Sequence, residues 1–550
     1  MATPPPTPTA PCVAEDSDVS WVLISSVLVL GMMPGLAFFE AGLLRAKNTT
    51  SVVIQIFSGA ALMPVLWILF GYSVTLGSNT KGGFIGDFSK SLFIGVQYDD
   101  CYNGLSIPEA LYGLFQMMFA TITPLLMTGA YAERLAFRPY LIYSVLWEIL
   151  IYYPVAHWIW GPGGWLAKMG VQDFAGGIVI HTTAGVSSLV AVLMLGQRRD
   201  FHKHHGEAPY SSLPLTSIGA TMLWTGWFGF NGGSALQAGQ SAVHAVMNSQ
   251  TAAVVCSTCF LFYVMFRTGK ASLLQCINGA IAGLAGVTPA SGYITVPAAF
   301  VLGIILAISA QVSIFILKHK LKIDDALDVS SVHGVPGLIG ALYIGFAGNS
   351  DVGGANGIIY GGGGKLLGVQ LLACIVASIW SIVFTYAILK FISLYYPLRV
   401  DDQGERLGLD HHQHDEPSTG LDVTTRDSAG PTHATPLIIG NGSGVGVRAS
   451  IASTTTRRSI AALRPNANLL TASTAAVCIQ DDSNNTVIIV GGNDGNMDTV
   501  DVDEDPRNFA DEYVTSPRGR SGSSDGRPLP NVNNNSVRSN PDRVSSAGIN

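Results

Sequence analysis

Two histidines, His181 and His333, stand inside segments that otherwise carry apolar and small side chains. An imidazole exchanges its proton near neutral pH and can both donate and accept hydrogen bonds. Polar groups are costly in hydrocarbon, and they commonly face a cavity or a partner. A single buried histidine is more often a satisfied core residue than a functional one. Two in corresponding segments, each with an aspartate upstream (Asp173 and Asp328), favour a pair that lines a pore.

The acidic residues near these histidines have two interpretations. Asp173 and Asp328 each stand near a helix start, so each is explained equally well as a helix cap or as part of a polar pathway. Glu148 lies in the middle of another apolar run. A carboxyl group there should be neutral, paired or turned toward an interface between subunits.

Long apolar runs contain these residues and must position them. A helix needs about 20 apolar residues to cross a bilayer. Two of the runs are long enough for two helices each, with breaks at Asn231–Gln250 and Thr288–Gly292. The sequence therefore predicts an all-α, polytopic membrane protein with eleven transmembrane helices. The runs are Val19–Leu44, Thr49–Thr80, Ala110–Ala132, Pro139–Ala167, Phe174–Gln197, Ala208–Phe266, Ala271–Leu317, Val329–Ser350 and Leu366–Leu389.

The histidine segments are the fifth and tenth of these helices, where a five-plus-five inverted repeat would place equivalent elements. Lysine and arginine are also distributed unequally between the loops, twelve in one set and four in the other. Because Lys and Arg accumulate in cytoplasmic loops, we predict an external N-terminus and a cytoplasmic C-terminus. The richer set is Arg45, Lys47, Arg134, Arg138, Arg198, Arg199, Lys203, Arg267, Lys270, Lys318, Lys320 and Lys322; the poorer set is Lys81, Lys90, Lys168 and Lys365.

Composition divides the chain into four parts. Only 12% of the 550 residues are charged and the mean hydropathy is +0.37, although the C-terminal part is polar. We predict a short external segment over residues 1–18, a membrane domain over 19–395, a cytoplasmic segment over 396–415 and a disordered cytoplasmic tail over 416–550. The tail has too little apolar surface to offset the entropy of ordering it.

Other kinds of chemistry have little support in the sequence. No basic stripe indicates nucleic-acid binding, and no nucleophile–base arrangement indicates an enzyme. Cys256 and Cys259 lie in an apolar run without a second cysteine pair, so we interpret them as packing residues and predict no metal site and no cofactor. Cys12 and Cys101 are the cysteines on the predicted external side and are candidates for a disulfide.

Five separated motifs resemble the ammonium transporter family (Amt/Mep/Rh), in the same order and over about residues 21–410. The resemblance implies an eleven-helix fold in a homotrimer, with one pore in each subunit. It also implies transport of ammonium, and of methylammonium, across a membrane, which we expect to be the plasma membrane, for nitrogen uptake. The motifs are Phe115–Ala120, Asp173–His181, Trp227–Ser234, Ile281–Gly292 and Asp328–Gly334.

The resemblance assigns roles to individual residues. It implies an external recruitment site, a stacked phenylalanine gate below it and twin histidines below the gate. Trp160 and the paired phenylalanines favour the Amt/Mep branch over the Rh branch. The recruitment site would contain Trp160, Ser234, Phe119 and Asp173, the gate Phe119 and Phe230, the pore His181 and His333, and Asp328 would be a structural acidic residue.

The same resemblance sets expectations for mechanism and regulation. An aromatic face attracts a cation, whereas burial of a bare ion in a dry pore is strongly unfavourable, so ammonium should lose a proton before ammonia passes the histidines. The segment 396–415 would regulate transport by contacting a neighbouring subunit, and cytoplasmic regulators or kinases would act on the tail. Two alternatives are an ammonium receptor that signals through its tail and a gas or small-solute channel of the Rh type.

Two features depart from the family pattern. The loop Gly161–Gly164 after Trp160 is one residue longer than expected, and Glu148 stands where a neutral residue is expected. Because no family role attaches to Glu148, we expect its replacement by glutamine to be tolerated.

Overall fold

The computed structural model describes residues 14–80, 82–99, 101–102, 104–204, 206 and 209–417, together with the backbone of three strands between residues 476 and 502. Residues 1–433 form one compact unit and residues 434–550 form a second. Each unit is described by itself.

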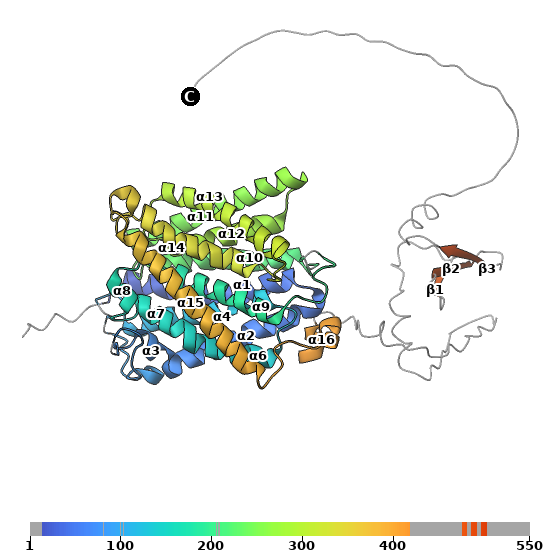
Figure 1. Ribbon diagram of the computed structural model, residues 1–550, viewed down its shortest axis with the longest axis horizontal. Helices are drawn as coiled ribbons and strands as arrows, with labels where there is room; N and C mark the ends of the chain where they lie inside the picture. The colour runs from blue at the N-terminus through green and yellow to red at the C-terminus, as the bar shows by residue number, and fades with distance from the viewer. Residues whose placement is uncertain are drawn as a thin grey trace, which may run out of the picture. The chain divides into compact units, whose positions relative to one another are not determined.

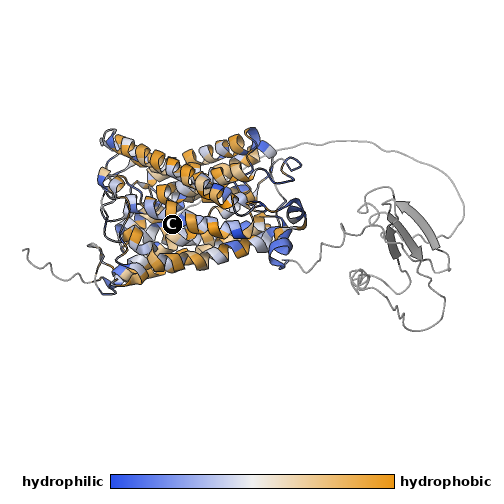
Figure 2. Ribbon diagram, turned by 60° about the horizontal axis from the view of Figure 1, so that its bottom comes forward, coloured by the Kyte–Doolittle hydropathy of each residue, from blue (hydrophilic) through white to orange (hydrophobic). Residues whose placement is uncertain are grey.

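The first unit is a bundle of helices, with α1, α4, α9 and α15 crossing its middle (Figure 1). Apolar residues cover the long helices between their ends, while hydrophilic residues gather at the ends (Figure 2). Such segments become helices in lipid because a helix satisfies its own backbone polar groups. The helices are α1 Asp16–Leu43, α2 Thr49–Leu66, α3 Tyr72–Leu76, α4 Glu109–Leu125, α5 Thr128–Tyr131, α6 Phe137–Trp147, α7 Tyr153–Trp160, α8 Trp165–Met169, α9 Thr183–Leu195, α10 Leu213–Gly233, α11 Gln240–Thr268, α12 Leu273–Val287, α13 Val296–Ile314, α14 Val335–Ala347, α15 Lys365–Ser393, α16 Asp402–Leu407 and α17 Leu409–His414, with 3-10 turns η1 Ala46–Asn48, η3 Ser91–Phe93 and η8 Ile358–Tyr360.

Each predicted apolar run is helical. In the described chain, eight helical segments have the length and apolarity of a membrane span. The other three predicted spans correspond to α6–α7, α10 and the short apolar helix α12. The run over residues 208–266 breaks between Gly233 and Gln240, which is a shorter interval than predicted. The run over residues 271–317 breaks between Val287 and Val296. The structure confirms the polytopic helical fold, while the count of eleven crossings stays a prediction.

Five π-helical segments belong to these long helices in the part of the chain that the structure describes. π-helical turns are rare in proteins, and those that occur are often found at functional sites. Glu148 begins one of them, and His181 and His333 lie in two others, so the three polar groups singled out from the sequence all lie on π-helical turns. The segments are η2 Trp67–Gly71, η4 Glu148–Tyr152, η5 Gly177–Thr182, η6 Phe315–Lys320 and η7 Ser330–Gly334.

Glycines allow the helices to approach closely. A Cβ atom at Gly219 of α10 would lie 2.2 Å from the backbone nitrogen of Phe39 in α1. A side chain there would force α1 and α10 apart, so this glycine serves packing, as small residues commonly do between membrane helices.

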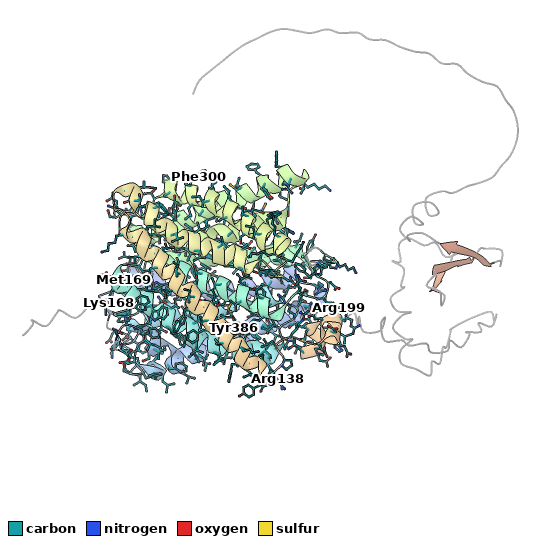
Figure 3. All side chains as sticks on the ribbon, in the orientation of Figure 1. Arg138, Lys168, Met169, Arg199, Phe300 and Tyr386 are labelled. Carbon is teal, nitrogen blue, oxygen red and sulfur yellow. The ribbon has the colours of Figure 1, made fainter. Side chains whose placement is uncertain are left out.

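Charged loops meet at one end of the bundle. The Glu133 carboxylate accepts from Arg45 at 2.8 Å and from Arg198 at 3.0 Å, and Arg198 also pairs with Asp324 at 2.8 Å. The two basic residues Arg138 and Arg199 lie toward this end, and Lys168 lies toward the opposite end (Figure 3). Members of the loop set rich in Lys and Arg therefore lie at one end of the bundle, and a member of the poorer set lies at the opposite end.

The segment after α15 folds back onto these loops. Asp410 of α17 accepts hydrogen bonds from the backbone nitrogens of Thr50 and Ser51 at 3.0 and 2.7 Å, and the Gln413 side chain accepts from the backbone of Phe137 at 2.6 Å. These side chains cap α2 and α6, whose first N–H groups have no partner within their own helix. The predicted regulatory segment therefore caps two helices of its own subunit.

The second unit contains a three-stranded antiparallel sheet in the order β1-β2-β3, formed by Ala476–Gln480, Thr486–Gly491 and Met497–Val502. Ile488 pairs with Cys478 on one side and with Val500 on the other. The run Val487-Ile488-Ile489-Val490 lies in β2, and its β-branched residues favour strands. The disordered tail over residues 416–550 stays a prediction, because most of that range lies outside the described residues.

Candidate functional site: an aromatic cavity, a gate and a histidine pair

A cavity of about 320 Å³ opens where α4, α7 and α10 meet. Trp160 forms part of its wall, and the indole N–H is held by a 2.8 Å hydrogen bond to the carbonyl oxygen of Asp173. The Ser234 hydroxyl donates to the carbonyl oxygen of Phe230 at 2.8 Å, so its oxygen can still accept a hydrogen bond from a ligand. The cavity is lined by Tyr112, Gln116, Phe119, Ile159, Trp160, Asp173, Phe174, Ser234, Ala235, Leu236 and Tyr293.

This lining brings together all four residues predicted for a recruitment site. Among the seven further lining residues, which sequence reasoning missed, three carry polar groups, namely Tyr112, Gln116 and Tyr293. Gln116 lies inside a motif that had already been singled out. Tyr112 is one helical turn before it on α4, so the helical period is a signal that could have found both.

Two phenylalanines close the floor of the cavity. The rings of Phe119 and Phe230 stack with centroids 4.2 Å apart at an interplanar angle of 25°, and both side chains are about 1% exposed. Phe119 also meets Trp160 edge-on, with centroids 6.2 Å apart. The predicted gate pair is therefore in contact, and one of its rings belongs to both cavity and gate.

The histidine pair lies next to Phe230. The Nδ1 atoms of His181 and His333 are 3.3 Å apart, and the imidazole of His181 is 6.2 Å from the Phe230 ring. Trp227 stacks against both imidazoles, with centroids 5.7 Å from His181 and 6.4 Å from His333, and its own N–H donates to Thr288. The Nε2 atom of His181 has no hydrogen-bond partner among the described residues.

This geometry fixes the hydrogen-bonding roles of the neutral pair. One hydrogen lies between the two Nδ1 atoms, so one imidazole is a donor there and the other an acceptor. The two outward Nε2 atoms then have opposite roles, one as an acceptor and one as a donor. A neutral solute with a lone pair and N–H groups can hydrogen-bond to both.

Two aspartates hold the π-helical segments that carry the histidines. The Asp173 carboxylate accepts from the backbone N–H groups of four consecutive residues, Gly176 to Val179, at 2.7–3.1 Å. At the other histidine, Asp325 accepts from Val329 and Ser330 at 3.0 and 2.7 Å. Each capping aspartate precedes its histidine by eight residues in the sequence. Both halves of the chain therefore cap the histidine segment with an aspartate at the same spacing.

Asp328 stays a candidate structural acidic residue, with contacts that differ from those of Asp173. Its carboxylate pairs with Lys318 at 2.7 Å and its backbone has φ of 58°, so Asp328 lies just before η7 in a turn conformation and does not cap it. Asp325, three residues earlier, is the cap. The equal spacing of eight residues was the sequence signal that would have identified it.

A glycine contact sets the distance between the histidine segments. A Cβ atom at Gly185 would lie 2.2 Å from the Cα atom of Gly334. Because neither residue has a side chain, α9 and η7 cross closely enough for the two imidazoles to meet.

The structure also places Glu148 and three of the cysteines that the sequence singled out. Glu148 is fully buried within the subunit and accepts from the hydroxyl of Tyr153 at 2.9 Å. Of the three interpretations, the one that placed Glu148 at an interface between subunits is therefore wrong. Cys101 is disulfide-bonded, whereas Cys12 lies outside the described residues. Cys256 and Cys259 are free thiols of α11.

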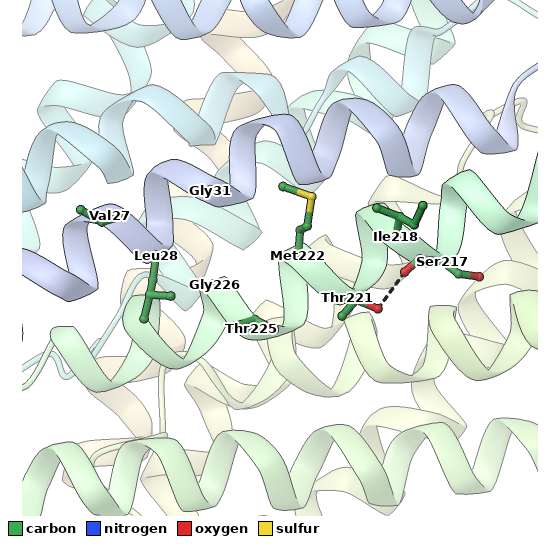
Figure 4. A pocket seen from close by; sticks show the side chains of 9 residues that line it. All are labelled: Val27, Leu28, Gly31, Ser217, Ile218, Thr221, Met222, Thr225 and Gly226. Carbon is green, nitrogen blue, oxygen red and sulfur yellow. Dashed lines mark hydrogen bonds between the residues drawn. The ribbon is translucent and has the colours of Figure 1, made fainter.

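A larger hollow of about 530 Å³ lies on the outside of the bundle, between α1 and α10 (Figure 4). Its walls are mainly apolar, and the hydroxyl group of Thr221 donates to the carbonyl oxygen of Ser217 in its own helix. It offers a packing surface and no chemistry related to the histidine pair.

A polytopic helical protein with an aromatic cavity, a stacked phenylalanine pair and a buried histidine pair has the construction of a membrane transporter. The model of the Ammonium Transporter Family matches residues 20–419. The chain belongs to this family, and it is an ammonium transporter rather than an enzyme.

Relatives and solved structures agree with this assignment. "Ammonium transporter 1" of Dictyostelium discoideum is 53% identical over 406 residues, which are 73% of this chain and 87% of that protein. "Ammonium transporter Amt1" of Archaeoglobus fulgidus is 40% identical, covering 73% of this chain and 99% of that protein. The crystal structure of Saccharomyces cerevisiae Mep2 is similar with a TM-score of 0.64 and 31% identity, over 71% of this chain and 88% of that one.

Proposed function

We propose that the protein recruits the ammonium cation in the aromatic cavity, removes a proton and passes ammonia along the histidine pair. The observation that carries the proposal is the order of the three features. A polar aromatic cavity, a closed phenylalanine stack and a buried histidine pair follow one another through contacts between Trp160, Phe119, Phe230 and His181.

The cavity suits a small cation with N–H donors. Trp160 offers its face to a positive charge, which is worth roughly 0.5–2 kcal/mol depending on desolvation. The Ser234 oxygen accepts one N–H bond, and the Asp173 carboxylate, although spent on four backbone N–H groups, adds negative potential nearby. Potassium and sodium ions share the attraction but donate no hydrogen bond.

The gate and the histidine pair then discriminate by chemistry. A bare cation would have to exchange its water shell for the rings of Phe119 and Phe230, which is strongly unfavourable. Ammonium can instead lose a proton and cross as neutral ammonia, which the two outward Nε2 atoms can hydrogen-bond. Alkali ions have no proton to give up and are therefore rejected.

The assembly and orientation belong to the same proposal. We infer a homotrimer in the plasma membrane with eleven crossings, an external cavity and cytoplasmic charged loops, a five-plus-five inverted repeat, and methylammonium as a second substrate. The matching Asp173–His181 and Asp325–His333 spacings support the repeat. The mainly apolar groove between α1 and α10 (Figure 4) supports a helical partner such as another subunit.

The test is purified protein in proteoliposomes. Initial rates of labelled methylammonium uptake and ammonium-evoked currents should saturate, and excess ammonium should compete with methylammonium while potassium should not. Equal competition by potassium would contradict the proposed mechanism.

A receptor function is the second candidate. A structure titled "Sensor Amt Protein" is similar with a TM-score of 0.66 and 27% identity, over 72% of this chain and 98% of that one. Saturable binding of ammonium without flux in the same proteoliposomes would favour that alternative.

A further inference from the structure

Gln370 is a fully buried amide near the start of α15. Its Oε1 atom accepts from the backbone N–H of Gln172 at 2.8 Å, and its Nε2 atom donates to the backbone carbonyl of the same residue at 2.7 Å. The Nε2 atom also donates to the carbonyl oxygen of Ala341 in α14 at 2.9 Å. A polar side chain in an apolar membrane helix is expensive, so an amide with three short hydrogen bonds calls for an explanation beyond packing.

The segment that Gln370 holds has no regular structure of its own. Residues 171–173 lie between α8 and η5 and form neither a helix nor a strand. Backbone groups of such a segment must find partners elsewhere in the protein. The Gln370 amide serves both backbone groups of Gln172, while the Gln172 side chain accepts from the backbone of Ala355 at 3.2 Å. One side chain of α15 therefore does for this turn what a neighbouring strand does in a sheet.

The next residue in this turn connects it to the aromatic cavity. The carbonyl oxygen of Asp173 accepts the indole N–H of Trp160 at 2.8 Å, and its carboxylate caps η5. The carbonyl group of Gln172 and the nitrogen of Asp173 belong to one planar peptide unit. A displacement at Gln172 is therefore passed on to the residue that holds the indole.

The other end of the Gln370 amide is anchored on a pore helix. Ala341 belongs to α14, which directly continues η7, the segment of His333. α14 also packs closely against η5, because a Cβ atom at Gly337 would lie 2.8 Å from the carbonyl oxygen of Gly177. Gln370 thus joins the turn before η5 to a helix that is itself in contact with η5.

We propose that Gln370 is a positioning residue for the recruitment of ammonium: it fixes the turn at Gln172 and Asp173, and this turn fixes the indole of Trp160. The inference rests on the proposed function and adds a residue to it. A preorganised binding group loses less freedom when the ligand arrives, so a fixed indole face binds a cation better than one that can turn. The role belongs to α15, the helix that runs diagonally across the bundle in Figure 1, although none of its residues lines the cavity.

The experiment measures initial rates of methylammonium uptake in proteoliposomes for the parent, Gln370→Leu, Trp160→Leu and the double variant. Leucine fills the position without hydrogen bonds. We expect Gln370→Leu to raise the half-saturation concentration on the order of fivefold, the size of one net hydrogen bond. Its maximal rate should change by less than about twofold, because a loss of ground-state binding alone does not slow the later steps.

The double variant separates positioning from general weakening of the fold. If Gln370 acts through Trp160, its replacement has little left to disturb once the indole is gone. In the Trp160→Leu background, Gln370→Leu should therefore change half-saturation by less than about twofold, because residues that act through one contact are not additive.

A second glutamine in a membrane helix supplies the matched control. Gln311 of α13 is half-buried, its amide donates to Gln275 at 3.1 Å, and it lies outside the cavity lining. Gln311→Leu should keep the parental half-saturation. If Gln370→Leu is not recovered in folded form, Gln370→Met takes its place, because methionine keeps the unbranched shape of the side chain and also lacks the amide.

Hydrogen exchange gives a readout that does not depend on transport. The N–H of Gln172 loses its acceptor in Gln370→Leu, so the peptide that contains it should exchange faster, on the order of fivefold. The N–H groups of Gly176 and Gly177 keep their bonds to the Asp173 carboxylate and should exchange as in the parent. Mass spectrometry of the purified parent and variant in detergent measures both.

The outcomes are distinguishable. If the parent shows no saturable uptake, the proposed function fails, and exchange at Gln172 still decides whether Gln370 holds the turn. Parental half-saturation in Gln370→Leu overturns the inference. An equal rise with and without the Trp160 side chain also overturns it, because Gln370 would then act elsewhere, and so does parental exchange at Gln172.

Discussion

The Nδ1 atoms of His181 and His333 lie 3.3 Å apart, with the two rings inclined by only 21°. Two imidazoles that share one hydrogen in this way act as a unit, since a change in one tautomer changes the other. The pair occupies the narrow space left by Gly185 and Gly334.

The first prediction concerns this pair. His181→Asp offers a negative charge to a bare cation, and His333→Ala leaves space for water, so both should admit potassium in addition to ammonium. Current–voltage recordings in ammonium and in potassium measure the change, with His244→Ala, a half-buried position on α11 outside the histidine pair, as control. Unchanged ammonium selectivity at normal surface expression would mean that the histidines do not enforce deprotonation.

The second prediction concerns the cavity. Trp160→Leu removes a cation–π contact worth roughly 0.5–2 kcal/mol, so half-saturation should rise by about 2- to 30-fold. Ser234→Ala should raise it as well. Ser217 on the same helix makes the same kind of bond, to Leu213, but lies outside the cavity lining, so Ser217→Ala should leave half-saturation unchanged. Parental half-saturation in Trp160→Leu and Ser234→Ala would refute the recruitment site.

The third prediction tests the assignment of Asp325 as the cap of η7. Asp325→Ala should lower stability by about 1–2 kcal/mol and reduce uptake, because His333 lies on the segment that loses its cap. The measurements are thermal unfolding in detergent and methylammonium uptake. Asp351, exposed in a loop, supplies the control Asp351→Ala. If Asp325→Ala loses no more stability and uptake than Asp351→Ala, Asp325 does not have this structural role.

The fourth prediction concerns pH and the charged loops. The neighbouring guanidinium groups of Arg198 and Arg45 outweigh burial and lower the pKa of Glu133 to about 2. A carboxylate with a lowered pKa stabilises the fold above its unfolded value, so this contribution should be lost as pH falls from about 4.5 toward about 2. Glu133→Gln leaves Arg198 without one partner and should cost about 3–5 kcal/mol. Acid unfolding curves of the two proteins measure the difference, and identical curves would contradict it.

The fifth prediction concerns the C-terminal segment. A chain ending after Pro417 keeps the caps from Asp410 and Gln413 and should retain folding and transport. A chain ending after Leu398 loses both, and it also loses the ion pair between Arg399 and Glu405, so it should unfold at lower temperature and transport more slowly. Size-exclusion profiles and uptake rates distinguish them. Loss of folding in the longer chain would show that residues beyond 417 contribute to the fold.

The sequence by itself determined the helical membrane fold, and it named four of the eleven residues that line the cavity. Apolar runs of sufficient length have few alternatives in a bilayer, because the backbone must satisfy itself. Polar groups in such runs are rare enough to be noticed one by one, which is why His181, His333 and Glu148 could be singled out. The motifs around Phe119, Trp160 and Ser234 then supplied their roles as expectations.

Only the tertiary structure decided which groups touch. That Asp325 rather than Asp328 caps η7 depends on the backbone path before the helix, and two aspartates three residues apart are equivalent in a pattern. The π-helical turns at Glu148, His181 and His333 leave no mark in hydropathy, since one extra residue in a turn does not change the apolar composition of the segment. The 3.3 Å distance between the imidazoles likewise depends on a contact between glycines 149 positions apart in the sequence, and no local property of either segment specifies it.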